Sequence, residues 1–145
     1  MKVFNGIILL LGLLLSAPAG NKEPQEISLI RLIANPEKFD GQLIKTIGFL
    51  RIEPEGTTLS VSFEDYQHGI AKNSVWIDLS ADMNKNSELL DMNYVLVVGI
   101  YRAQQQGHMA CCSGTVTEIS RAMQWSQLKN PRRGKTHAIA KVDVH

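Results

Sequence analysis

Four side chains of the sequence have the chemical types that bind divalent metals or transfer protons: Glu64, Asp65, His68 and His108. Carboxylate and imidazole groups suit zinc or a similar ion. Asp65 and His68 are three residues apart, so one helical turn would bring them to the same side. His108 lies in a different loop, and the sequence has no H-E-x-x-H pattern. A metal-binding protein or metal-dependent hydrolase is therefore an alternative, and histidines that only make structural hydrogen bonds fit the same pattern.

A second set of side chains predicts a surface for a ligand. Ser60, Ser62, Trp76 and Asp78 fall on the outward positions of two predicted strands, together with Thr58. A tryptophan among small hydroxyls can stack on a base, a sugar ring or an extended peptide. The set contains no Lys or Arg, and a carboxylate repels phosphate. An oligosaccharide or peptide is thus favoured over nucleic acid, and the alternative is that the N-terminal segment covers the tryptophan.

The two cysteines, Cys111 and Cys112, are neighbours in the chain. A disulfide between neighbours closes a strained eight-membered ring, so ordinary pairing is disfavoured. In a strand their side chains would point to opposite faces, leaving one thiol buried and one able to form an intermolecular disulfide. No C-x-x-C pattern is present, so the sequence favours no redox role.

The elements that must position these residues are mostly strands. The apolar stripe of Ile27, Ile30, Leu32 and Ile33 predicts a helix over residues 27–34, with Ser28 as its N-cap and Pro36 ending it. The first strand carries apolar residues on both parities, which predicts either burial on both sides or a strand that bends between two sheets, and Gly48 is its expected bend or bulge point. The predicted strands are residues 42–52, 57–63, 74–79, 94–101 and 111–119, with a weak helix over 82–91. Alternation places Leu59, Val61 and Phe63 inward in the second strand and Val75, Ile77 and Leu79 inward in the third, and a bulge is expected near Gly114 in the fifth.

This order predicts a mainly β fold, a five-stranded Greek-key barrel with a short helix between strands three and four. The opening of the first strand, NPEKFDGQLIKTIGF at residues 35–49, is similar to bacterial OB-fold proteins of the tRNA-anticodon-binding-like kind. Residues 94–99 resemble a later strand of the same domain, and EDYQHG at 64–69 resembles small exported bacterial proteins without assigned function. The resemblance implies a binding module with its ligand face on strands two and three, but the fold hosts many functions.

The N-terminus reads as a signal peptide over residues 1–19. Lys2 precedes an apolar run at residues 7–15, and Ala17 and Ala19 provide small residues at the cleavage site. This predicts an exported protein, periplasmic or secreted, with no membrane span after cleavage; an uncleaved anchor is the alternative. The predicted division is a signal peptide at 1–19, a polar lead-in at 20–26, a domain at 27–128 and a basic tail at 129–145.

Charge is unevenly distributed along the chain. The whole sequence has 15 Lys and Arg against 14 Asp and Glu, which gives no general argument for nucleic-acid binding. Residues 20–128 are net acidic and residues 129–145 are net basic. An interaction protein that docks by its basic tail is therefore a third hypothesis. The sequence predicts a non-enzymatic protein whose partner is a polar oligomeric ligand or another protein, with no cofactor beyond the zinc alternative.

Overall fold

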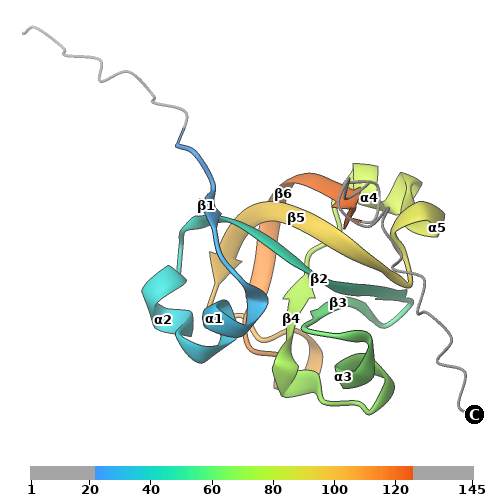
Figure 1. The fold of residues 1–145 in the computed structure, drawn as a ribbon, viewed down its shortest axis with the longest axis horizontal. Coiled ribbons are helices and arrows are strands. Elements are labelled where there is room, and N and C mark those ends of the chain that lie inside the picture. Colours follow the sequence, from blue (N-terminus) through green and yellow to red (C-terminus); the bar gives the residue numbers. More distant parts are fainter. Residues whose placement is uncertain (1–21, 126–145) are drawn as a thin grey trace, which may run out of the picture.

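Residues 22–125 of the computed structural model form a mainly β structure with several short helices (Figure 1). The predicted signal peptide and the predicted basic tail lie outside these described residues. None of the helices in residues 22–125 has the length and apolar character that a membrane crossing requires.

The strands form one sheet that closes on itself. Strand β2 pairs in antiparallel fashion with both β3 and β5, and β3 pairs in antiparallel fashion with β4. Strand β6 closes the sheet, because it pairs in parallel with β4 and in antiparallel fashion with β5. The strands are β1 Gln25–Glu26, β2 Leu43–Glu53, β3 Gly56–Ser60, β4 Ser74–Ile77, β5 Asn93–Arg102 and β6 Thr115–Gln124. The helices are α1 Leu29–Ala34, α2 Pro36–Phe39, α3 Phe63–Gln67, α4 Ala81–Lys85 and α5 Ser87–Leu90, with 3₁₀ turns η1 Ala71–Asn73 and η2 His108–Ala110.

The predicted count of five strands is wrong by one. The extra strand, β1, is a two-residue segment that pairs in parallel with Ile44 and Lys45 of β2. Both of its residues are exposed, so the predicted polar lead-in carried no apolar alternation that would have indicated a strand. The prediction of a mainly β fold with a helix before the first long strand is confirmed, and the single helix predicted over residues 82–91 is two short helices, α4 and α5, between β4 and β5.

Strand β2 belongs to two parts of the sheet, which explains its apolar residues on both parities. Ile44 and Leu50 on one parity are fully buried, and Phe49 on the other parity is only 4% exposed. Its residues 43–50 pair with β5, and residues 49–53 pair with β3. At Gly48, just before the second pairing begins, a Cβ would lie 2.6 Å from the carbonyl oxygen of Ser60. Glycine is therefore required here by the close approach of β3.

The start of helix α1 agrees with the sequence prediction, whereas its buried face agrees only in part. The Ser28 hydroxyl accepts a hydrogen bond from the Arg31 amide at 3.3 Å and begins α1, as predicted. Leu32 is fully buried under the sheet. Ile30 was expected on the same apolar face but is 65% exposed, because Leu29 takes the buried position.

Two predicted strand boundaries are wrong. The second strand ends at Ser60, because the Ser62 hydroxyl accepts from the Asp65 amide at 3.0 Å and begins α3. Phe63, expected to point inward, is 37% exposed at the start of that helix. The last strand begins only at Thr115, and the irregularity expected near Gly114 lies instead in the β5–β6 pairing, between Val98 and Ile100.

Candidate functional site

A groove of about 360 Å³ crosses the face formed by β3 and β4. Its floor includes Thr58, Ser60 and Trp76 from these strands. Its walls come from three connections: the β2–β3 hairpin, the segment from α3 to η1, and the loop between β5 and β6. Its volume is in the range of small-molecule sites, so the groove is the main candidate for a binding site.

The indole of Trp76 is held by two glycines from different loops. An added Cβ at Gly56, in the hairpin, would overlap the outer edge of the six-membered ring. An added Cβ at Gly107, in the β5–β6 loop, would lie 2.5 Å from Cε3 and 2.6 Å from Cδ2. Because only a backbone without a side chain fits against this ring, both loops fix its orientation. The rest of the partly exposed indole lines the groove.

The predicted ligand residues are only partly brought together. Ser60 and Trp76 both line the groove, although Ser60 was expected to point outward and is only 3% exposed. Ser60 is paired with Ser74 of β4 and both lie at the floor. Ser62 caps α3, and its hydroxyl is engaged by Asp65. Asp78 follows β4 and lines a smaller depression of about 240 Å³, which Trp76 also borders.

The four predicted metal ligands are divided. Asp65 and His108 line the groove from opposite connections, whereas Glu64 and His68 are exposed residues of α3 and its C-terminal end. Both carboxylate oxygens of Asp65 already accept hydrogen bonds, from Asn73 at 2.9 Å and from Ser62 at 3.0 Å. Within residues 22–125, no three His, Cys, Asp or Glu side chains lie close enough together to hold a metal ion.

The charged groups along the groove are acidic. Glu53 and Glu55 come from the hairpin and Asp65 from α3. Of the described residues that line the groove, none is Lys or Arg. Lys72, which does not line it, donates from Nζ to the Ala110 carbonyl at 2.9 Å. The electrostatic environment therefore disfavours a phosphodiester and accepts neutral or cationic groups.

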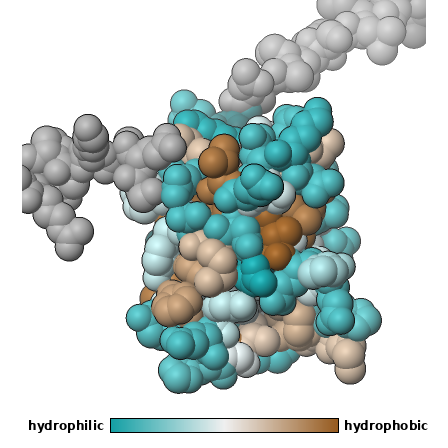
Figure 2. Space-filling model, turned by 90° about the vertical axis from the view of Figure 1, so that its right-hand side faces the viewer, coloured by the Kyte–Doolittle hydropathy of each residue, from teal (hydrophilic) through white to brown (hydrophobic). Residues whose placement is uncertain are grey.

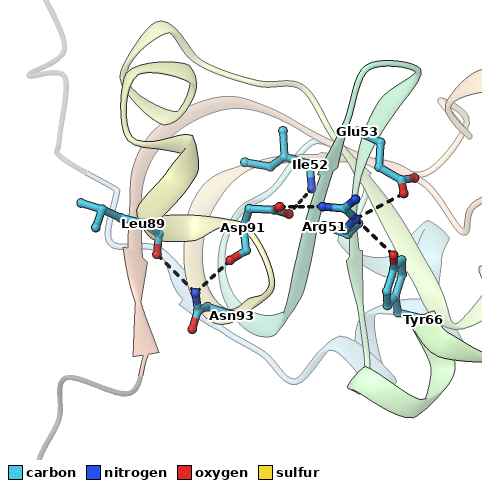
Figure 3. Close-up of polar contacts among 7 residues, drawn as sticks. All are labelled: Arg51, Ile52, Glu53, Tyr66, Leu89, Asp91 and Asn93. Carbon is cyan, nitrogen blue, oxygen red and sulfur yellow. Dashed lines mark hydrogen bonds and ion pairs between the residues drawn. The ribbon is translucent and has the colours of Figure 1, made fainter.

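One wall of the groove is held by a polar network around Arg51 (Figure 3). Its Nη1 lies 2.6 Å from Asp91 Oδ2, and its Nε donates to Tyr66 Oη at 3.1 Å and to Glu53 Oε1 at 3.2 Å. The other oxygen of Asp91 accepts from the Ile52 amide at 2.8 Å. The pKa of Arg51 is raised overall. Burial alone would lower it, but the hydrogen bond to Tyr66 and the negative charges of Asp91 and Glu53 stabilise the charged guanidinium more than burial disfavours it. The network joins β2, α3 and the turn before β5, and so positions Glu53 and Tyr66.

The sequence reasoning missed the loop between β5 and β6 as a wall of the groove. Met109 and Ala110 lie in the left-handed region, with φ of 53° and 52°, and neither is glycine. Met109 is 87% exposed beside the groove. Cys111 and Cys112 follow in the same loop, where strand geometry had been expected. Gly107, two residues before Met109, was the one signal in the sequence for an unusual backbone in this loop.

The rest of the surface offers weaker candidates. A second groove, of about 330 Å³, lies between α1 and β2 and is bordered by Trp125. Seen from the side of the molecule, hydrophobic residues form small separate patches among hydrophilic ones (Figure 2). That face therefore presents no broad apolar surface.

Comparison with known proteins gives limited similarity. No protein-family profile and no curated protein sequence matches the chain. A structure of the S. pombe Stn1–Ten1 complex is similar over 80% of this chain and 90% of that chain, with 15% identity and a TM-score of 0.44. A putative aspartyl-tRNA synthetase from Leishmania major Friedlin is similar over 75% of this chain and 22% of that chain, with 9% identity and a TM-score of 0.43. Likenesses of this degree define neither fold nor ligand, so the strand pairings and the groove carry the functional argument.

Proposed function

We propose that the protein is a non-enzymatic binding module with an OB-fold, which holds an extended neutral oligosaccharide in the groove lined by Trp76. The carrying observation is that an indole fixed between two loops lies in a groove with three carboxylates and, among its described lining residues, no Lys or Arg. An uncharged peptide is the second ligand class that these groups would accept. The predicted export of the chain, periplasmic or secreted, is part of the proposal.

The strand pairings support the OB-fold. Leaving out the short β1, the ring runs β2–β3–β4–β6–β5 and returns to β2. Helices α4 and α5 lie between β4 and β5, which are the third and fourth of these strands in chain order. A five-stranded Greek-key barrel of this kind binds its ligands on the face of its second and third strands, between the first and last hairpin loops. In this chain those elements are β3, β4, the β2–β3 hairpin and the β5–β6 loop. They are the elements that surround Trp76.

The chemistry of the groove supports a sugar before a nucleic acid. The face of a sugar ring is apolar and packs on an indole, and its hydroxyls donate well to carboxylates such as Glu53, Glu55 and Asp65. The same carboxylates would repel a phosphate backbone, which OB-folds that bind nucleic acid meet with a positive groove. The ligand we propose is therefore uncharged, with a flat apolar face for the indole and several hydroxyl groups around its edge for the carboxylates.

The test is a binding screen with the full chain on an array of neutral and anionic oligosaccharides, followed by calorimetric titration of the strongest neutral sugar. An uncharged tetrapeptide and a dT oligonucleotide are titrated alongside. We expect saturable sugar binding that changes little with salt. Stacking on one aromatic ring is worth about 1–3 kcal/mol, so Trp76→Ala should weaken binding roughly 5- to 150-fold.

Trp125→Ala is the matched control, because Trp125 borders the second groove and should leave sugar affinity unchanged. Equal loss in both variants would show a general effect on folding. Salt-dependent binding of the oligonucleotide in preference to every sugar would contradict the proposal. Preference for the tetrapeptide would keep the groove and replace the ligand class.

A further inference from the structure

The two cysteines lie side by side in the wall of the groove. Their sulfur atoms are 2.7 Å apart, and both residues line the groove. A strand would have turned them to opposite faces, but the turn after η2 gives Cys111 helical angles, with φ of −65° and ψ of −39°. The backbone therefore directs both thiols to the same side, where they touch.

The two thiols differ in access. Cys111 is partly exposed, whereas Cys112 is fully buried. Burial raises the pKa of the Cys112 thiol, and its contact with Cys111 adds to the rise. An external disulfide can therefore reach Cys111 first, while Cys112 is placed to attack the sulfur of Cys111 afterwards.

We propose that Cys111 and Cys112 form a site of reversible oxidation, in which a disulfide-bearing oxidant converts the pair into a disulfide between neighbours. The Cys111 thiolate attacks the oxidant's disulfide, forms a mixed disulfide and releases one thiol. Cys112 then attacks the Cys111 sulfur and expels the oxidant's second half as a thiolate, which takes up the proton that Cys112 loses. Two electrons pass from the pair to the oxidant, whose disulfide is reduced to two thiols.

The ring that forms is readily opened again. Neighbouring Cα atoms are about 3.8 Å apart, less than the roughly 4.4–6.8 Å of ordinary disulfides. A bond under such strain has a more oxidising potential than a structural disulfide and is reduced by ordinary thiols. The pair therefore suits a modification that is made and removed, rather than a permanent cross-link.

The loop transmits the change to Trp76. Five residues before Cys112, Gly107 packs against the indole, and the Cys112 amide donates to the Gln106 carbonyl at 3.1 Å. Met109 and Ala110, between them, already have positive φ, so this segment has little freedom to absorb a new ring. Closing the ring thus shifts Gly107, and the indole with it. If the groove holds a ligand as proposed, oxidation changes its affinity.

The test exposes the full chain to oxidised glutathione, unfolds it in guanidinium chloride at low pH, blocks remaining thiols with iodoacetamide after the pH is raised, and measures the intact mass and the peptide that contains both cysteines. We expect the chain to lose the mass of two hydrogens, to resist alkylation at both cysteines and to remain a monomer on a non-reducing gel. Dithiothreitol should restore both alkylation sites. A stable glutathione adduct on the wild-type chain, a cross-linked dimer, or thiols that stay alkylatable would overturn the proposal.

Single variants test the order of the steps. Cys112→Ser should stop at a mixed disulfide on Cys111, whereas Cys111→Ser should react much more slowly. In a Trp125→Phe chain, where Trp76 is the remaining tryptophan, oxidation should shift the fluorescence emission. Ring closure without a change in emission would refute the link to Trp76. These readouts need no ligand, so failure of sugar binding would contradict the proposed function alone.

Discussion

Replacing Gly107 by Ala places a methyl group against the indole of Trp76, and this gives the sharpest test of how the groove is built. The added Cβ would lie 2.5 Å from Cε3 and 2.9 Å from Cγ of the ring. Gly107 also has φ of +70° and ψ of −165°, a region that is essentially restricted to glycine and that costs another residue about 1–3 kcal/mol. A measured loss of stability would therefore combine a backbone effect with a packing effect.

Gly69→Ala is the control for a positive φ without a packing contact. Gly69 has φ of +66°, nearly the same as Gly107, but a Cβ added there meets nothing within 4 Å. Its loss should be the backbone effect alone, about 1 kcal/mol after the lower entropy of the unfolded alanine chain is included. Gly107→Ala should lose about 1–3 kcal/mol more, as in other overpacked sites.

The assay is urea unfolding of the full chain, followed by circular dichroism, with the two variants and the wild type compared at a common slope. We expect Gly107→Ala to unfold at a clearly lower urea concentration than Gly69→Ala. The fluorescence of Trp76, measured in a Trp125→Phe background, should change in Gly107→Ala and not in Gly69→Ala. Equal midpoints and equal emission in the two variants would refute the packing of Gly107 on the indole.

Three further predictions concern the sheet that carries the groove. Gly48→Ala should lower stability by about 1–3 kcal/mol in urea unfolding, because the new Cβ meets the Ser60 carbonyl at 2.6 Å; unchanged stability would contradict the close approach. Asp91→Asn should lower stability by about 1 kcal/mol, and the difference should shrink in high salt, because it removes a half-buried ion pair with Arg51; a salt-independent difference would contradict this. Burial raises the pKa of Tyr101 to about 12, so its native hydroxyl stays protonated while the unfolded chain ionises near pH 10. Tyr101 therefore lowers stability by about 1.4 kcal/mol per unit between pH 10 and 12, and Tyr101→Phe should show a shallower decline over this range in pH-dependent urea unfolding; parallel curves would contradict it.

The sequence predicted the parts of the fold that local chemistry determines. The hydroxyl of Ser28 and the ring of Pro36 mark the limits of α1 without any tertiary contact. Alternation along β4 correctly separated the buried Val75 and Ile77 from the partly exposed Trp76. The long strand β2 was recognisable because apolar residues on both parities indicate a strand that is covered on both faces or bends between two parts of a sheet.

The end of β3 shows how two local signals compete. Leu59, Val61 and Phe63 alternate as in a strand, yet Ser62 and Asp65 also have the spacing of a helix cap. In the structure the cap prevails, since Asp65 gains bonds from both Ser62 and Asn73 and, within residues 22–125, no strand pairs with Phe63. The cap spacing of Ser62 and Asp65 thus indicated α3 in the sequence, but the strand-like alternation of the apolar residues was given more weight.

The loop between β5 and β6 could not be predicted for a different reason. Positive φ at Met109 and Ala110 has no local cause, because neither residue favours the left-handed region. Bonds from distant segments hold the loop, including Lys72 to the Ala110 carbonyl and the Ser113 amide to the Ser74 carbonyl. The contact between Cys111 and Cys112 depends on this loop, so it followed from tertiary structure and not from their adjacency.

The central claim is that ligand binds where Trp76 lies, and the two tryptophans of the chain provide the direct measurement. Trp76 borders the groove on β3 and β4, and Trp125 borders the second groove beside α1. The indole N–H signals of the ¹⁵N-labelled full chain should be followed by NMR while the strongest neutral oligosaccharide from the array is added. We predict that the Trp76 signal shifts and saturates while the Trp125 signal stays in place. Saturable binding that shifts the Trp125 signal, and leaves that of Trp76 unchanged, would contradict the account.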